Sequence, residues 1–456
     1  MSSSLIVSCG SIVVADNTSR FIPIAGGIAD TSYGTPMTEA QAELPIVLAG
    51  VASKMFSRVS ANTASVNSTI HLRKNQASPA NGLTVTYTSD LTGVLEDTTN
   101  SVSYDAGDKT CWLVAVPTEA GTNNITIKVL GFQFDPTDTS KCWSICNIAN
   151  NNGPEGGNIY FDENPQWHWC PNGGGGSGTV GPGAPDPFQT ESGSSMLCRF
   201  AFTVSRFYGY IFDNACVGST LVTVRKNFAD GNNQLTFTTA TGIIDDATHS
   251  DDFAIGDHFN FGFRITGNDG VGGNDWQMSI LGANIVHGGT VFPFISSGFG
   301  NSTIAAGATH YRGVSGSVLS VSTTESNTQF YPRMAFTARE LTCHVPVNNN
   351  TDAATTVTLR KGGADTALTL SIPASLTGDF TDTTNSVSID AGPGNEINYK
   401  VSNLGATSYC SVMNITMLGH TGAWDPGGPG GPAPGRRLGL VRGAERSRGR
   451  SGVGVC

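Results

Sequence analysis

One stretch of the chain occurs twice in nearly the same wording, and this repetition limits the possible folds more than any other feature. Residues 97–103 read Asp-Thr-Thr-Asn-Ser-Val-Ser, and the same seven residues return at 382–388. Leu-Arg-Lys precedes both copies, at 72–74 and at 359–361. A weaker third copy, with Val-Arg-Lys-Asn at 224–227, lies between them. Repetition over such distances predicts three tandem copies of one structural unit.

Each copy shows the period of β-strands. Residues 355–359 and 367–372 alternate polar with apolar side chains, which is the two-residue period of a half-buried strand. The chain has 57 glycines but only 13% charged residues, so the lysines and glutamates that cover exposed helices are scarce. These features predict an all-β protein of three tandem antiparallel β-sandwich domains, jelly-roll-like, with roughly eight strands each.

The repeats also predict where the domains begin and end. We expect an N-terminal segment at 1–24, a sandwich at 25–149, a Gly/Pro/Trp-rich loop or linker at 150–195, a diverged sandwich at 196–300, a third sandwich at 301–425 and a disordered Gly/Pro/Arg-rich tail at 426–456. Segment 1–24 has two interpretations: a strand donated to a neighbouring chain, or the first strand of its own domain.

The charge distribution argues against nucleic acid as a partner. The formal net charge is −11, and the tail from Gly427 onward carries six arginines against Glu445, so the rest of the chain carries −16. A body this acidic repels a phosphate backbone. No stretch is apolar over the ~18 residues that a transmembrane helix needs, so we expect no membrane span.

The ten cysteines include no Cys-x-x-Cys pair, and structural zinc is not predicted. For an extracellular chain we predict disulfides, one between Cys343 and Cys410 and one among Cys142, Cys146 and Cys170. The alternative, for a chain that matures in a reducing cell, is that the cysteines are small buried hydrophobic residues.

No catalytic motif is present, so we predict no enzyme, no catalytic residue and no cofactor. A run of aspartates has the oxygen ligands that calcium prefers: Asp245, Asp246, Asp251, Asp252 and Asp257. However, the equivalents in the other copies, Asp97 and Asp382, are single turn residues. We therefore favour side chains that accept hydrogen bonds from their own turn, and predict no metal. The repeated Arg-Lys pairs suggest a shared role in the fold.

Two groups of residues are candidates for contact with sugars. Trp167, His168 and Trp169 form either a platform that stacks on glycans or an anchor that fastens the long loop to a sheet or a neighbouring subunit. Six Asn-x-Ser/Thr sequons are candidate glycosylation sites: Asn17, Asn67, Asn124, Asn301, Asn349 and Asn414.

The repeated wording, with Leu-Arg-Lys, Leu-Thr-Gly, Asp-Thr-Thr-Asn-Ser-Val-Ser and Asp-Ala-Gly, resembles uncharacterised β-sandwich repeat proteins of viral, phage-like structural components and environmental extracellular fibrils. The resemblance covers about residues 20–425 and implies a fibre or virion role without catalytic residues. We therefore predict a self-assembling structural protomer of an extracellular fibril or virion appendage, with copies of itself as the main partner and an extracellular or virion-surface location. The alternative is a glycan-binding adhesin or receptor-binding protein.

Overall fold

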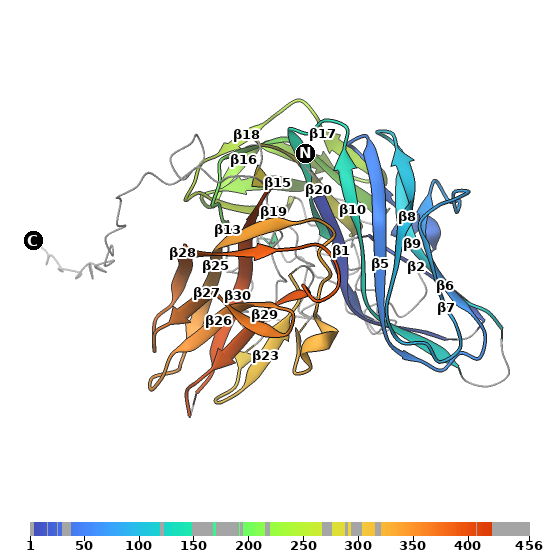
Figure 1. The fold of residues 1–456 in the computed structure, drawn as a ribbon. Helices are drawn as coiled ribbons and strands as arrows, with labels where there is room; N and C mark the ends of the chain where they lie inside the picture. Colours follow the sequence, from blue (N-terminus) through green and yellow to red (C-terminus); the bar gives the residue numbers. More distant parts are fainter. Residues whose placement is uncertain are drawn as a thin grey trace, which may run out of the picture.

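The structure is a computed structural model. It describes residues 4–29 except 16 and 25, 38–118, 123–147, 167–169, 191, 195–214, 219–266, 276–287, 291–292, 303–314 and 321–421 except 407. Within these ranges the chain forms three β-sandwich domains, as the repeats predict (Figure 1). No helix among these residues is long and apolar enough to cross a membrane.

Domain 1 contains two five-stranded sheets. The inner sheet, which faces the other domains, has the order β3-β1-β10-β5-β8, and the outer sheet has the order β2-β9-β6-β7 with β4 also on β9. Its elements are β1 (Ser4–Ala15), β2 (Thr18–Ile22), β3 (Gly26–Ala29), the short helix α1 (Glu39–Ala42), β4 (Leu44–Pro45), β5 (Gly50–Asn62), β6 (Ser68–Lys74), β7 (Thr84–Tyr87), β8 (Gly93–Tyr104), β9 (Lys109–Val116) and β10 (Asn124–Pro136).

Domain 2 repeats this plan. Its inner sheet has the order β11-β20-β14-β17 with β18 on β14, and its outer sheet has the order β12-β19-β15-β16 with β13 on β19. The strands are β11 (Lys141–Asn147), β12 (Trp167–Trp169), β13 (Met196–Leu197), β14 (Phe202–Asn214), β15 (Ser219–Lys226), β16 (Ala229–Phe237), β17 (Gly242–Asp246), β18 (Asp251–Phe253), β19 (His258–Thr266) and β20 (Trp276–His287).

Domain 3 has an inner sheet ordered β21-β30-β25-β28, with β22 on β30, and an outer sheet ordered β24-β23-β29-β26-β27. Its elements are β21 (Val291–Phe292), β22 (Thr303–Ile304), β23 (Thr309–Arg312), β24 (Val321–Ser322), the 3-10 turn η3 (Glu325–Asn327), β25 (Phe336–Asn348), β26 (Thr355–Lys361), β27 (Ala364–Ile372), β28 (Gly378–Ile389), β29 (Ile397–Asn403) and β30 (Cys410–His420).

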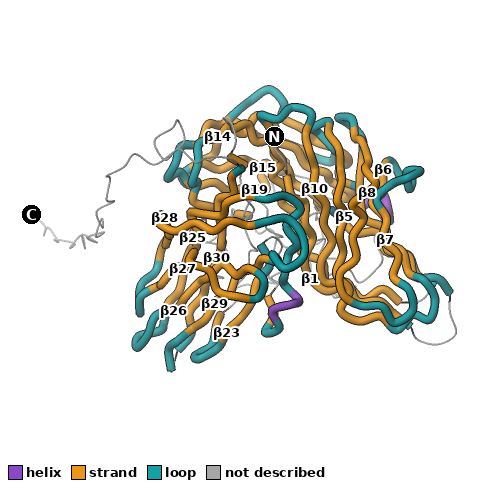
Figure 2. Tube along the Cα trace, viewed as in Figure 1, coloured by secondary structure: helices purple, strands orange, loops and turns teal. Residues whose placement is uncertain are grey.

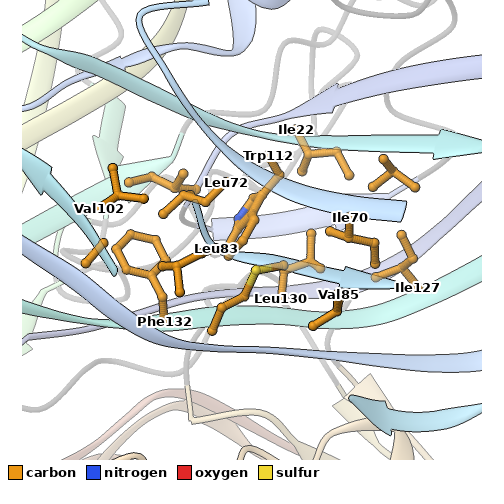
Figure 3. Packing of buried hydrophobic residues seen from close by; sticks show 14 of the residues in the cluster. Ile22, Ile70, Leu72, Leu83, Val85, Val102, Trp112, Ile127, Leu130 and Phe132 are labelled. Atoms are coloured by element: carbon orange, nitrogen blue, oxygen red, sulfur yellow. The ribbon is translucent and has the colours of Figure 1, made fainter. Parts of the chain in front are cut away.

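An aromatic residue lies at the same ladder position in each domain core. Trp112 pairs with Leu72 in domain 1, and its equivalents in the registers of domains 2 and 3 are Phe261 and Tyr399. All three side chains are fully buried. Trp112 contacts Phe132 edge to face, with ring centroids 5.5 Å apart (Figure 3). An aromatic ring at this position buries a large apolar area between the two sheets.

The domains begin earlier than the repeated wording predicts. Segment 1–24 supplies β1 and β2, which pair with β10 and β9 of the same chain. Strand β11, before residue 149, already belongs to domain 2, and so does β12 within the predicted linker 150–195. In each domain an early strand pairs with the last strand. These early strands have no similar sequences, so the repeats do not reveal them. The tail 426–456 and most of 150–195 lie outside the described residues.

The three domains contact one another pairwise (Figures 1 and 2). Phe56 and Val129 of domain 1 belong to the hydrophobic cluster of domain 3, Tyr208 of domain 2 belongs to that of domain 1, and Leu418 of domain 3 belongs to that of domain 2. All four residues lie on inner sheets. The inner sheets therefore form the contacts that close the three domains into a triangle.

Candidate functional site: repeated clasps and domain interfaces

The aspartate that opens the repeated Asp-Thr-Thr-Asn sequence forms the same clasp in each domain. In domain 3, one oxygen of Asp382 accepts from the backbone and side chain of Thr384 and from the backbone of Asn385; the other accepts from the Asn385 side chain and from the backbone of Thr369 on β27. These distances are 2.8–3.2 Å. The aspartate clasp therefore ties the edge strand of the inner sheet to the edge strand of the outer sheet.

Asp97 and Asp246 form the equivalent clasps. Asp97 accepts from Thr99, Asn100 and the backbone of Thr84, as Asp382 does with its own partners. Asp246 accepts from Thr248, His249 and the backbone of Gln234, again across to the outer sheet. The prediction that these carboxylates accept hydrogen bonds from their own local backbone agrees with this geometry, but Asp97 and Asp382 lie at bulges within β8 and β28 instead of in turns between strands.

Hydrogen bonds control the ionisation of the clasp. Burial by itself raises the pKa of Asp246, but the hydrogen bonds from Gln234, His249 and Thr248 outweigh it and lower the pKa to about 2. Burial opposes the same kind of hydrogen bonds at Asp97 and Asp382, whose pKa values are also lowered. The clasp is therefore formed by the charged carboxylate.

The aspartates of the acidic run in domain 2 bind other protein groups. No group of three or more His, Cys, Asp or Glu side chains among the described residues is arranged to hold a metal ion. The members other than Asp246 each have a protein partner: Asp245 with Arg206, Asp251 with the backbone of Asn232 and Asn233, Asp252 with Thr203, and Asp257 with Asn227 and Lys226.

The arginine of each repeated Arg-Lys pair binds a glutamate that the sequence analysis missed. Arg73 donates through Nε and Nη2 to both carboxylate oxygens of Glu39, and Arg225 and Arg360 bind Glu191 and Glu325 in the same bidentate way, with distances of 2.7–2.9 Å. The hydrogen bond to glutamate is the main cause that raises the pKa of each arginine. The overlooked signal is a constant spacing, since the glutamate precedes its arginine by 34, 34 and 35 residues.

The interface between domains 1 and 3 combines aromatic and charged contacts. The Phe56 ring meets the Phe330 ring edge to face, with centroids 5.4 Å apart. The Arg333 guanidinium lies 4.6 Å from the centre of the Phe56 ring, and its Nη2 is 2.7 Å from Oε1 of Glu96. Lys54 Nζ donates to the carbonyl oxygen of Arg333 at 3.1 Å. Arg333 therefore fixes domain 3 on domain 1 through three different contacts.

Charged groups also join domains 2 and 3. Arg199 Nη2 lies 2.6 Å from Oε2 of Glu340, whose side chain is 1% exposed. Nearby, Asp379 of domain 3 contacts two histidines, His344 of its own domain at 2.8 Å and His258 of domain 2 at 3.5 Å. These contacts form the interface between domains 2 and 3.

The interface between domains 1 and 2 uses tyrosines. Tyr208 is fully buried and packs against the core of domain 1, and Lys109 Nζ lies 5.9 Å from the centre of the Tyr210 ring. Gly282 provides the room that Tyr208 needs, because a Cβ atom at this glycine would lie 2.3 Å from the tyrosine ring. This interface therefore depends on Gly282, because the absence of a side chain there leaves room for the Tyr208 ring.

Two of the three interfaces use the same parts of the domains. Lys54 and Glu340 occupy equivalent bulges on β5 and β25, both with the left-handed φ that lysine and glutamate rarely adopt, 52° and 53°. Each contacts an arginine-bearing loop of another domain, Arg333 and Arg199 respectively. The backbone strain at these bulges coincides with the interfaces, which indicates that the bulges serve domain contact. Such head-to-tail contacts are heterologous interfaces that close on themselves.

We predict that Arg333→Met loosens the contact between domains 1 and 3 by about 1–2 kcal/mol, because it removes a charge-assisted hydrogen bond and a cation–π contact but keeps the side-chain volume. Hydrogen exchange should rise in peptides from β5 and from residues 330–336. Lys361→Met is the control, because Lys361 pairs with Asp390 inside domain 3. Equal exchange in wild type and Arg333→Met would contradict the assigned role of Arg333.

The predicted disulfide between Cys343 and Cys410 is wrong. Both residues are free and buried, as are Cys111 and Cys198. On the β25–β30 ladder Cys410 lies opposite Asn348, five residues from Cys343, so the two Cα atoms are roughly 15 Å apart along the strands. A disulfide needs Cα atoms within about 7 Å. The side chains of the other predicted cysteines, Cys142, Cys146 and Cys170, lie outside the description.

The candidate sugar contacts and sequons have different surroundings. Trp167, His168 and Trp169 form strand β12, which pairs with β19, but the directions of their side chains lie outside the description. The sequon asparagines Asn17, Asn67 and Asn349 are exposed, Asn124 is half-buried and Asn414 is buried. Asn301 lies outside the described residues.

The chain matches no protein-family model and no curated protein sequence.

Proposed function

We propose that the chain is a self-assembling structural protomer of an extracellular fibril or virion appendage. The observation that supports this function is that the repeated polar residues form contacts inside each domain. The three clasp aspartates join strands, and the three Arg–Glu pairs join a strand to a helical segment, all within their own domains. A protein that keeps its most repeated charged groups for internal contacts is suited to mechanical and packing roles.

The surfaces for assembly follow from the triangle. The inner sheets face other domains of the same chain, so contacts between chains use the outer sheets and the loops. The β8 and β28 edges of the inner sheets are poor sites for strand addition, because each carries an Asp-Thr-Thr-Asn bulge in mid-strand. We therefore place the contacts between chains on the faces of the outer sheets and on their loops. The low charged fraction lowers the desolvation cost of such contacts.

Light scattering after size-exclusion chromatography, together with negative-stain microscopy of the purified full chain, tests this function. We expect regular filaments or rings whose mass rises with protein concentration. Particles of single-chain mass at every concentration, combined with binding on a glycan array, would overturn the structural role and favour an adhesin.

A further inference from the structure

The sequon at Asn414, Ile415 and Thr416 lies where a glycan has no room. It is part of β30, which pairs with both β25 and β21 in the inner sheet of domain 3. Asn414 is 3% exposed and Thr416 is 5% exposed. Both positions are therefore enclosed in the folded chain.

The acceptor atom itself is engaged in the contact between domains. Asn414 Nδ2, the atom to which an N-linked glycan is attached, donates to the carbonyl oxygen of Ser195 in domain 2 at 2.9 Å. A glycan on this nitrogen would have to occupy the space between domains 2 and 3. Glycosylation at Asn414 is therefore incompatible with the three-domain triangle.

Because glycosylation precedes folding, this steric conflict depends on the compartment in which the chain folds. In a glycosylating secretory route the sugar is transferred to sequons of the unfolded nascent chain. The inner sheet of domain 3 cannot form before β30 has been synthesised, because β21, β22 and β25 all pair with β30. Asn414 would therefore meet the transferase before the fold protects it.

A second observation agrees with this reasoning. Cys111, Cys198, Cys343 and Cys410 are free and buried, one in each of domains 1 and 2 and two in domain 3. Free thiols persist in reducing compartments, whereas folding in an oxidising compartment exposes them to mispairing. We infer that the chain folds in a reducing compartment that lacks N-glycosylation, and that it reaches any extracellular or virion location only after folding.

The test compares two routes for the full chain in one eukaryotic cell line: expression in the cytosol, and expression behind a cleavable signal peptide. Thr416→Val removes the sequon, keeps Asn414, and leaves the side chain at position 416 nearly the same size. We expect wild type to fold in the cytosol. In the secretory route we expect it to carry a glycan on Asn414 and to be recovered in soluble form at least tenfold less than Thr416→Val.

Two further arms keep the test decisive. Thr351→Val removes the sequon at the exposed Asn349 and should give no rescue. An inhibitor of N-glycosylation should rescue wild type even where Thr416→Val itself folds poorly. Folded wild type that is secreted in normal amounts, with or without a glycan on Asn414, would overturn the inference, and so would failure of both Thr416→Val and the inhibitor to raise the soluble yield. None of these outcomes depends on whether the protein assembles.

Discussion

Replacing Asp382 with alanine should destabilise domain 3 by about 3 kcal/mol. The carboxylate accepts five hydrogen bonds, and its loss leaves the backbone N–H of Thr369 and the donors of the bulge without their acceptor. Asp382→Asn should cost less, about 1–2 kcal/mol, because the amide keeps one acceptor oxygen. Scanning calorimetry can follow the domain 3 transition. The exposed neighbour Thr383→Ala is the control, with an expected change within 0.5 kcal/mol, roughly the usual effect of a surface substitution.

The same clasp gives stability a defined pH dependence. Because the folded-state pKa of each clasp aspartate is lowered, the unfolded chain binds more protons in acid, and the clasp's contribution is present above about pH 4 and is lost as pH falls. For Asp246 the loss extends down to about pH 2. Asp382→Ala should therefore flatten the fall in stability of domain 3 below about pH 4. An unchanged slope would show that other carboxylates dominate acid unfolding.

Replacing Arg225 with leucine should destabilise domain 2 by about 3–5 kcal/mol, the usual cost of removing one partner from a buried ion pair. The Arg225 side chain is 7% exposed and that of Glu191 is 14% exposed, so the carboxylate would remain poorly solvated without its guanidinium. Arg225 also donates to Asp230 and to the carbonyl oxygen of Phe228, and both contacts would be lost. Calorimetric or denaturant unfolding of the full chain measures the loss.

Two further variants separate the effect of losing the ion pair from the effect of changing the side-chain volume. Lys226→Leu changes the adjacent cation, whose side chain is 37% exposed, and should cost about 1 kcal/mol or less. The double variant Glu191→Leu with Arg225→Leu removes both charges and should recover part of the loss. If the double variant were as unstable as the sum of its two single variants, the ion pair would not be the cause.

The fold was largely predictable because the strand period and the turn residues are local signals. The Asp-Thr-Thr-Asn repeat identified equivalent residues, and the prediction that their carboxylates accept local hydrogen bonds agrees with the clasps, although Asp97 and Asp382 lie at bulges within strands. The glutamate partners were missed because a single glutamate in diverged text carries no local signal, although its spacing from the arginine is constant. The error at Cys343 and Cys410 has the same origin as the missed interfaces: both depend on strand register and bulges, which sequence periodicity does not determine.

Covalent linkage explains why one interface can differ from the others. Arg199 and Arg333 precede β14 and β25 in equivalent loops, but the corresponding residue before β5 is Val47. The connections from Pro136 to Lys141 and from His287 to Val291 are short, so the domains meet at a high effective concentration rather than by free diffusion. Under this tether, even an interface too weak to hold separate subunits together would stay closed. Each domain can therefore change its surface independently, which three identical separate chains could not do.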